Sequence, residues 1–151
     1  MKGELINMYK HQLTIIIPAF NAEKFIERCL DSLVEQEGDY EVIVVNDGSS
    51  DNTKRILEKY SCMNSFIKVI NQDNAGVSAA RNAALNIISG RYFTFVDADD
   101  WMEKDFLKGI NPYLMDNYDV ILFGRYFNTE DTEWTLNPLY ENIKGFNVHS
   151  V

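Results

Sequence analysis

A chain of 151 residues is long enough for one domain with a buried core and short for two. Its hydrophobic fraction of 46% and aromatic fraction of 13% argue against intrinsic disorder. The net charge of −9 argues against nucleic-acid binding, which requires a cationic surface. No apolar run reaches the roughly 20 residues that span a bilayer, and the first residues lack a signal-peptide core. We therefore expect one cytoplasmic domain over residues 1–151, without a transmembrane segment.

Short apolar runs alternate with amphipathic stretches along the chain. Residues 13–18 (LTIIIP) form a nearly continuous apolar run, which is typical of a strand buried on both faces. Apolar residues then recur at helical spacing over residues 22–36. The alternation continues with predicted strands at residues 41–46, 65–70, 92–96 and 120–127, and predicted helices at residues 52–60, 75–88 and 103–114. Asp51 is placed to cap the second helix, and Gly90 to end the third.

This alternation predicts an α/β fold with an open, mostly parallel, Rossmann-like sheet and helices on both faces. Such sheets bind ligands beyond the carboxyl ends of their strands, where the strand order switches. Three polar segments fall in that zone, namely PAFN, NDGSSD and DADD, after the first, second and fourth predicted strands. Residues 128–151 have weak periodicity and are expected to form an irregular tail.

The DADD segment concentrates carboxylates at a strand end. Such charges repel each other unless a cation lies among them, and Asp97 and Asp99 straddle a small residue, so both can face one point. Mg²⁺ and Mn²⁺ select oxygen ligands of this type, together with substrate phosphates. The alternative is a turn before an acidic helix start, in which Asp100 and Glu103 favour the helix dipole. For Asp100 both interpretations stay open.

Two further residues could face a ligand at the same edge. Asp47, after the second predicted strand, is either a turn residue or an acceptor for a base N–H or a sugar hydroxyl. Arg81, early in the third predicted helix, either reaches a diphosphate or pairs with an acid. Gly76 would let that helix begin close to a neighbour or a ligand.

Several other classes of protein fit poorly. The chain has neither a GxGxxG segment after its first strand nor a GxxxxGK[ST] segment, which disfavours dinucleotide dehydrogenases and P-loop enzymes. The two cysteines, Cys29 and Cys62, lack CxxC spacing, so we expect buried packing residues and no zinc site. A haloacid dehalogenase phosphatase also places DxD after a strand, but it expects Thr or Val where Trp101 stands.

Four segments together resemble the family 2 glycosyltransferases of GT-A fold: TIIIPAFNAEKFIERCLDSLVEQ, YEVIVVNDGSSDNT, NAGVSAARNAAL and GRYFTFVDADDW. They cover residues 13–101, which we take as a donor-binding core. The resemblance implies an inverting transferase that uses Mg²⁺ or Mn²⁺. It also implies a nucleoside diphosphate sugar, a UDP-sugar first, as the donor, and a glycan or lipid-linked acceptor.

The resemblance also implies roles for particular residues. The nucleotide pocket is lined by Pro18, Ala19, Asn21 and Glu23, with Asp47 at the base and Arg81 near the nucleotide and the diphosphate. The direct metal ligand is Asp99, with Asp97, nearer the ribose, as a second one. Ala98, between them, is a further substrate-binding residue.

The resemblance leaves the acceptor side unassigned, because members of the family continue well past the DADDW segment. We expect a chain truncated after its donor-binding half, which binds donor but transfers poorly. No catalytic base is assigned; the acids available for that role are Asp116, Asp119, Glu130, Asp131 and Glu133. The alternative is a catalytically silent nucleotide-sugar-binding module. A homo-oligomer and a location at the inner face of the membrane also stay open.

Overall fold

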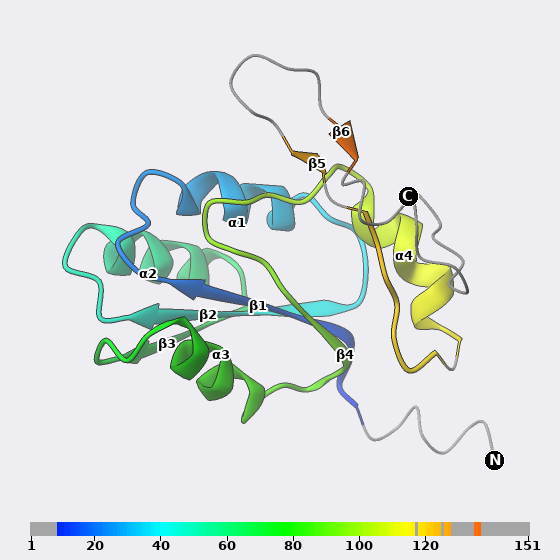
Figure 1. Cartoon of the computed structure of the whole chain (residues 1–151), viewed down its shortest axis with the longest axis horizontal. Helices are drawn as coiled ribbons and strands as arrows, with labels where there is room; N and C mark the ends of the chain where they lie inside the picture. Colours follow the sequence, from blue (N-terminus) through cyan, green and yellow to red (C-terminus); the bar gives the residue numbers. More distant parts are fainter. Residues whose placement is uncertain (1–8, 117, 125, 128–134, 137–151) are drawn as a thin grey trace. The chain divides into compact units, whose positions relative to one another are not determined.

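The computed structural model describes residues 9–116, 118–124, 126–127 and 135–136. The chain divides into two units, residues 1–108 and 109–151, and each is described by itself. The first unit alternates strands and helices along the chain (Figure 1). Its elements are β1 (His11–Ala19), α1 (Ile26–Val34), β2 (Tyr40–Asp47), α2 (Thr53–Met63), β3 (Ile67–Gln72), α3 (Val77–Leu85) and β4 (Gly90–Phe95).

The four strands form one parallel sheet in the order β3-β2-β1-β4. The chain moves outward from β1 to β2 and β3, and then returns to the other side of β1 to form β4. The strand order therefore switches between β1 and β4. Because all strands are parallel, their carboxyl ends meet at one edge, where α/β sheets bind ligands. The predicted α/β fold is confirmed.

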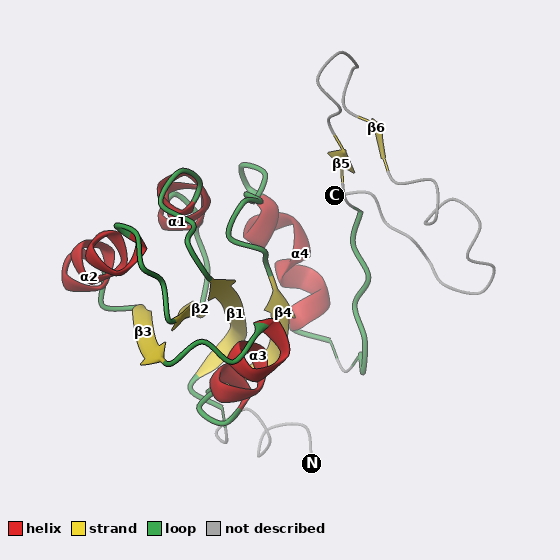
Figure 2. Cartoon of the chain, turned by 60° about the vertical axis from the view of Figure 1, so that its left-hand side comes forward, coloured by secondary structure: helices red, strands yellow, loops and turns green. Residues whose placement is uncertain are grey.

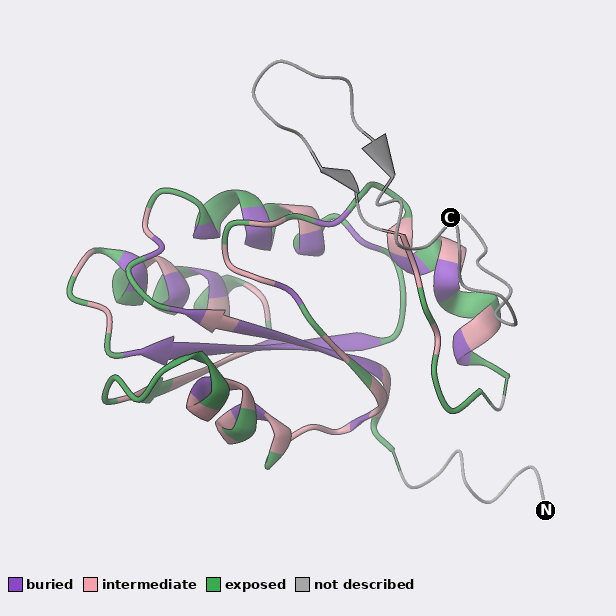
Figure 3. Cartoon of the chain, in the orientation of Figure 1, coloured by how far each residue is buried: buried purple, intermediate pink, exposed green. Residues whose placement is uncertain are grey.

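Helices cover both faces of this sheet, as predicted, with α1 and α2 on one side and α3 on the other (Figure 2). The central strands β1 and β2 are consequently buried (Figure 3). On the α3 side, Ile16, Ile43 and Val45 pack with Ala80 and Ala84. The small alanine side chains let α3 lie close to the sheet, and each fully buried isoleucine or valine contributes roughly 1.5–3 kcal/mol.

The helix α1 begins at Ile26, four residues later than the helical periodicity predicts. The backbone N–H groups of Ala22 and Glu23 donate to side chains at the start of α2 and in the loop before it, Thr53 Oγ1 at 2.8 Å and Asp51 Oδ2 at 3.1 Å. Ala22 and Glu23 therefore satisfy their backbone N–H groups outside the helix, which hydrophobic periodicity cannot reveal. Asp51 also accepts from Thr53 N, at 2.9 Å, so it caps the start of α2 from two residues away.

Gly90 does not end a helix, and that prediction is wrong. It is the first residue of β4, and its N–H donates to Thr14 Oγ1 at 2.9 Å. A Cβ atom at position 90 would lie 2.5 Å from the backbone nitrogen of Thr14. Glycine is therefore required there for the close approach of β4 to β1.

The fifth predicted strand, over residues 120–127, forms only at its end. Residues 120–124 form no strand, and Tyr126–Phe127 (β5) pairs antiparallel with Thr135–Leu136 (β6). An apolar run becomes a strand only where a partner edge is available, and its composition does not report that partner. The helix α4 (Phe106–Leu114) precedes this region. The rest of the expected tail lies outside the described residues. No helix in the described ranges is long and apolar enough to cross a membrane.

A buried acidic side chain ties the sheet together at the amino ends of its strands. Glu41, with 1% of its side chain exposed, accepts from Lys68 Nζ at 2.6 Å. It also accepts from Thr14 Oγ1 at 2.8 Å and from Ser89 N and Oγ at 2.6 and 2.8 Å. Burial would raise the pKa of Glu41, but the hydrogen bonds from Lys68, Ser89 and Thr14 outweigh it and lower the pKa to about 2, against an ordinary 4.5.

Replacement of Glu41 should therefore destabilise the chain in a pH-dependent way. A lowered pKa contributes stability that is present above pH 4.5 and is lost as the pH falls toward 2. In urea denaturation at pH 6, we expect Glu41→Gln to lower the free energy of unfolding by about 1–3 kcal/mol. The difference in the free energy of unfolding between this variant and the unmodified chain should narrow as the pH falls from 4.5 to 2. The exposed Glu58→Gln is the control, and a difference of constant size would contradict the assignment.

Candidate functional site

The loops that follow β1 and β2 are joined by side-chain hydrogen bonds at the carboxyl edge of the sheet. Asn21 has a positive φ of 49°, which asparagine tolerates better than most residues. Its Oδ1 accepts from Ser50 N at 2.8 Å, and its own N–H donates to Ser49 Oγ at 3.0 Å. Glu23 Oε2 accepts from the backbone and side-chain nitrogens of Asn52, both at 2.9 Å. Asn21 and Glu23 therefore hold the shape of this edge.

Asp47, the last residue of β2, is 3% exposed and holds the loop before α3. Its carboxylate accepts from Gln72 Nε2 at 2.7 Å, Ala75 N at 2.9 Å and Gly76 N at 2.8 Å. The hydrogen bond from Ala75, with those from Gln72 and Gly76, lowers the pKa of Asp47 despite its burial. Gly76 has a φ of 88°, so glycine is needed there for its conformation; a Cβ atom at this position would meet no atom of the described residues within 4 Å.

Residues 97–101 follow β4 and are called the acidic loop below. The N–H of Val96 still donates to Ile16 of β1, at 3.0 Å, so the loop starts beside the strand-order switch. Asp97 Oδ1 accepts from Arg81 Nη2 on α3 at 3.0 Å. Asp100 N donates to Asp97 O at 3.0 Å, which closes a turn with Ala98 and Asp99 at its centre. Of the alternative interpretation, a turn before an acidic helix start at Asp100 and Glu103, the turn is present, but α4 begins only at Phe106.

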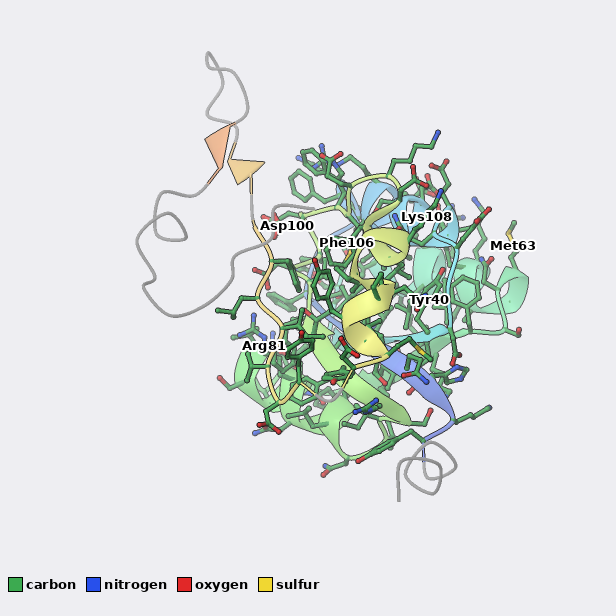
Figure 4. The ribbon with its side chains drawn as sticks, turned by 90° about the vertical axis from the view of Figure 1, so that its right-hand side faces the viewer. Tyr40, Met63, Arg81, Asp100, Phe106 and Lys108 are labelled. Atoms are coloured by element: carbon green, nitrogen blue, oxygen red, sulfur yellow. The ribbon has the colours of Figure 1, made fainter. Side chains whose placement is uncertain are left out.

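Arg81 is held by two neighbours of different kinds. One is the Asp97 carboxylate, and the other is the ring of Phe95, whose centroid lies 5.1 Å from the guanidinium carbon. Its Nε is buried without a hydrogen-bond partner among the described residues. Figure 4 shows Arg81 and Asp100 on the same side of the view, away from Met63. The cation therefore lies beside the acidic loop, where it offsets part of the charge of the carboxylates.

Asp99 is exposed, and within residues 9–116 no hydrogen bond or ion pair reaches its carboxylate. Its backbone carbonyl instead accepts from Arg28 Nη2 at 3.0 Å. An exposed carboxylate beside a second, Asp97, is a donor set that suits a hard divalent cation whose coordination is completed by phosphate and water. In the described ranges no three His, Cys, Asp or Glu side chains converge on one point, so among those residues the donor set is at most this pair.

A sequence model described as Glycosyl transferase family 2 matches residues 14–148. The chain belongs to glycosyltransferase family 2. Glycosyltransferase GlyA of Streptococcus pneumoniae is 41% identical to it over 123 residues, which cover 81% of this chain and 18% of GlyA.

Solved structures agree with this family 2 assignment. S. aureus TarS 1-349 in complex with UDP-GlcNAc superposes with a TM-score of 0.62 and 37% identity, over 68% of this chain and 30% of that one. Mannosyltransferase PcManGT from Pyrobaculum calidifontis, in complex with GDP-Man and Mn²⁺, gives 0.63 and 28%, over 72% and 34%. The predicted family and GT-A type of fold are confirmed. The chain spans about a third or less of these relatives.

The structure places the predicted site residues of this family 2 chain in two groups. Arg81 and Asp97 are in contact, with Ala98 and Asp99 directly following in the acidic loop. The others lie on the ends of β1 and β2 or the loops after them: Pro18, Ala19, Asn21, Glu23 and Asp47. Their roles toward a ligand stay predictions.

Of the acids available as a base, Asp116 and Asp119 are exposed residues of the second unit. Glu130, Asp131 and Glu133 lie outside the described residues. Of the two cysteines, Cys29 is buried as expected, and burial, with the nearby Asp100 and Asp99, raises its pKa to about 12. Cys62 is exposed, so its predicted burial is wrong.

Sequence reasoning missed the residues of α1 that contact the segment after β4. Arg28, Ser32 and Gln36 are spaced four residues apart, so they share one side of the helix and its C-terminal extension. All three bind backbone atoms of residues 99–107. The available signal was this spacing of polar residues beside the buried stripe of α1.

Removal of the Asp47 charge should loosen the loop that leads into α3. We expect Asp47→Asn to lower the free energy of unfolding by about 1–3 kcal/mol, because an amide offers one acceptor oxygen in place of two and leaves a backbone N–H unpaired. Amide hydrogen exchange should also quicken at Ala75 and Gly76. The exposed neighbour Asp73→Asn is the control. Unchanged exchange at these two amides would refute the anchoring role.

Proposed function

We propose that this family 2 chain binds a nucleoside diphosphate sugar at the carboxyl edge of β1, β2 and β4. The observation that carries the proposal is the arrangement of one cation on α3 and two carboxylates in the acidic loop. The guanidinium of Arg81 contacts Asp97 at 3.0 Å, and the carboxylate of Asp99, two residues later, is exposed. This pattern provides a positive group for a diphosphate and oxygen ligands for the cation that accompanies it.

The nucleoside is proposed to lie against the joined loops after β1 and β2. Pro18 and Ala19 are the last residues of β1, and Asn21 and Glu23 join the loop after β1 to the loop after β2. Asp47 accepts from the backbone just before α3. TarS 1-349 binds UDP-GlcNAc and PcManGT binds GDP-Man, which supports a nucleoside diphosphate sugar here. We propose uridine as the base, with Asp47 sharing its carboxylate between the α3 loop and the base.

Mg²⁺ or Mn²⁺ is proposed to be held by Asp99, with Asp97 as a second ligand or a partner of the ribose, beside Ala98. The PcManGT complex with Mn²⁺ supports a divalent ion in this family. When bound, such an ion neutralises the charge that develops on the leaving diphosphate. Two carboxylates leave most coordination positions for phosphate oxygens and water, which is the usual arrangement for Mg²⁺.

The proposed reaction is transfer of the sugar to a hydroxyl of a glycan or lipid-linked acceptor, with inversion. The acceptor oxygen forms a bond to the anomeric carbon while the bond from that carbon to the diphosphate oxygen breaks. The electron pair leaves with the diphosphate, and Arg81 contributes positive charge on that side. The acceptor proton goes to a base, which typically contributes about 10²–10⁴-fold.

Nucleotide binding should depend on the divalent ion. We expect UDP to raise the melting temperature with Mn²⁺ and to have little effect in EDTA, because Asp97 and Asp99 repel a bare diphosphate. At a hundred times its Kd, a ligand adds about 2.7 kcal/mol of stability, which a thermal-shift panel of UDP, GDP, CDP and dTDP resolves. Equal shifts in EDTA and Mn²⁺ would remove the metal from the proposal.

The two neighbouring acids of the acidic loop should behave differently. Asp99→Ala removes an exposed carboxylate, and we expect it to weaken Mn²⁺-supported UDP binding by about tenfold or more. Asp100→Ala alters a turn residue and should change that affinity far less. Isothermal titration of both variants with UDP and Mn²⁺ provides the comparison, and equal losses would reject Asp99 as the ligand.

A further inference from the structure

The segment after β4 runs beside α1 (Figure 1). It is held there by hydrogen bonds from side chains of α1 and the residues after it to its backbone. Ser32 Oγ accepts from Met102 N at 3.0 Å. Gln36, which is largely buried, donates to Glu103 O at 2.9 Å and accepts from Leu107 N at 3.0 Å. The bonds to Met102 N and Glu103 O satisfy backbone groups of a segment without regular structure, and the bond to Leu107 N satisfies the first turn of α4. Together they determine the path of the chain from β4 to α4.

Arg28 provides the contact of this series that reaches the acidic loop. Its Nη2 donates to the carbonyl of Asp99 at 3.0 Å, and its guanidinium carbon lies 3.9 Å from the ring centroid of Trp101. A planar guanidinium can donate at its edge and stack on its face at the same time. Arg28 therefore contacts the loop on both sides of Asp100, at Asp99 and at Trp101.

These contacts fix the backbone from which the Asp99 carboxylate projects. The carbonyl held by Arg28 belongs to Asp99 itself, so rotation of that peptide is restrained. The Asp97 carbonyl is also in contact with the helix, through Cys29 Sγ at 3.9 Å, and the Asp97 side chain is held by Arg81. The backbone of the acidic loop is thereby held by α1, and the Asp97 carboxylate is held by α3 on the opposite face of the sheet.

We propose that Arg28 is a positioning residue for the divalent-ion site, which it serves through the backbone of Asp99 and the ring of Trp101. This inference rests on the proposed function, because it concerns the ion that Asp99 would bind. Arg28 would contact neither the ion nor the nucleotide. Its part is to keep the Asp99 carboxylate pointing to one place before the ligand arrives, so that binding need not order the loop.

The first test needs no ligand. Arg28 is exposed, so Arg28→Ala should fold, and the equally exposed Arg55→Ala on α2 is the matched control for loss of a helical cation. We expect amide hydrogen exchange of residues 97–102 to quicken in Arg28→Ala and to stay unchanged in Arg55→Ala. Unchanged exchange in Arg28→Ala would overturn the proposal, because the loop would then be held by other contacts.

The second test compares the Kd of UDP with Mn²⁺ and with EDTA. We expect the Kd with Mn²⁺ to rise about tenfold in Arg28→Ala, as for other groups that orient a metal ligand, with the Kd in EDTA unchanged. The Kd in EDTA divided by the Kd with Mn²⁺ therefore falls about tenfold. Arg28→Lys keeps the charge without the planar fork, so it should restore little of the ratio. Full restoration by lysine, or an unchanged ratio in Arg28→Ala, would overturn the positioning role.

These two tests also separate this inference from the proposed function. If the unmodified chain binds no nucleotide with Mn²⁺, the proposed function fails and the role of Arg28 at an ion site fails with it. The exchange experiment would then still decide whether Arg28 holds the acidic loop. If the unmodified chain binds UDP with Mn²⁺ and Arg28→Ala does so equally well, only the inference about Arg28 fails.

Discussion

The carboxyl edge of the sheet depends on one constraint, which is that loop backbone must find hydrogen-bond partners where no helix or strand supplies them. In this chain the partners are mostly carboxylate, hydroxyl and amide side chains. Asp47 binds the loop before α3, Asn21 and Glu23 bind the loop after β2, and Gln36 binds the segment after β4. Each of these bonds joins segments far apart in the sequence. The edge is therefore ordered by polar contacts, whereas the centre of the sheet is ordered by apolar packing.

Stability and binding use opposite ends of the same strands. The Glu41 network lies where β1 and β2 begin, and the proposed ligand site lies where they end. A buried charge at the amino end is paired and fully hydrogen-bonded, as a structural charge must be. The carboxylate of Asp99 at the carboxyl end is exposed, without a partner in the described part of the chain. Burial and pairing therefore distinguish a structural acid such as Glu41 from a candidate ligand-binding acid such as Asp99 better than the residue types alone.

The sequence predicts the order of the elements in the first unit well because apolar periodicity follows burial directly. The run LTIIIP becomes the central strand β1, and the third amphipathic stretch becomes α3. Predictions fail where one residue serves a distant partner. Gly90 follows a helix and so looks like its end, yet its role is to let β4 approach Thr14. The apolar run at residues 120–124 has strand composition, but composition does not supply a neighbouring edge.

The same limit applies to the site. Asp97 and Asp99 stand out because clustered charge after an apolar strand is costly, and Arg81 stands out as a cation near the same edge. The internal hydrogen bonds of Asp47 and the contacts of Arg28 do not stand out, because both depend on partners 25 or more residues away. Local patterns identify the groups that could meet a ligand, and only the fold identifies the groups that hold them in place.

The contrast between the two cysteines makes the chain ready for labelling at a single position. A thiol reacts through its thiolate, and Cys29, buried with a pKa of about 12, forms almost none at neutral pH. Cys62 is exposed near the end of α2. The charged groups proposed to bind the diphosphate and the ion, Arg81, Asp97 and Asp99, are not on this helix. A maleimide fluorophore should therefore attach at Cys62 alone without prior removal of Cys29. The protein can therefore be labelled with a reporter dye for binding studies without any substitution in its buried core.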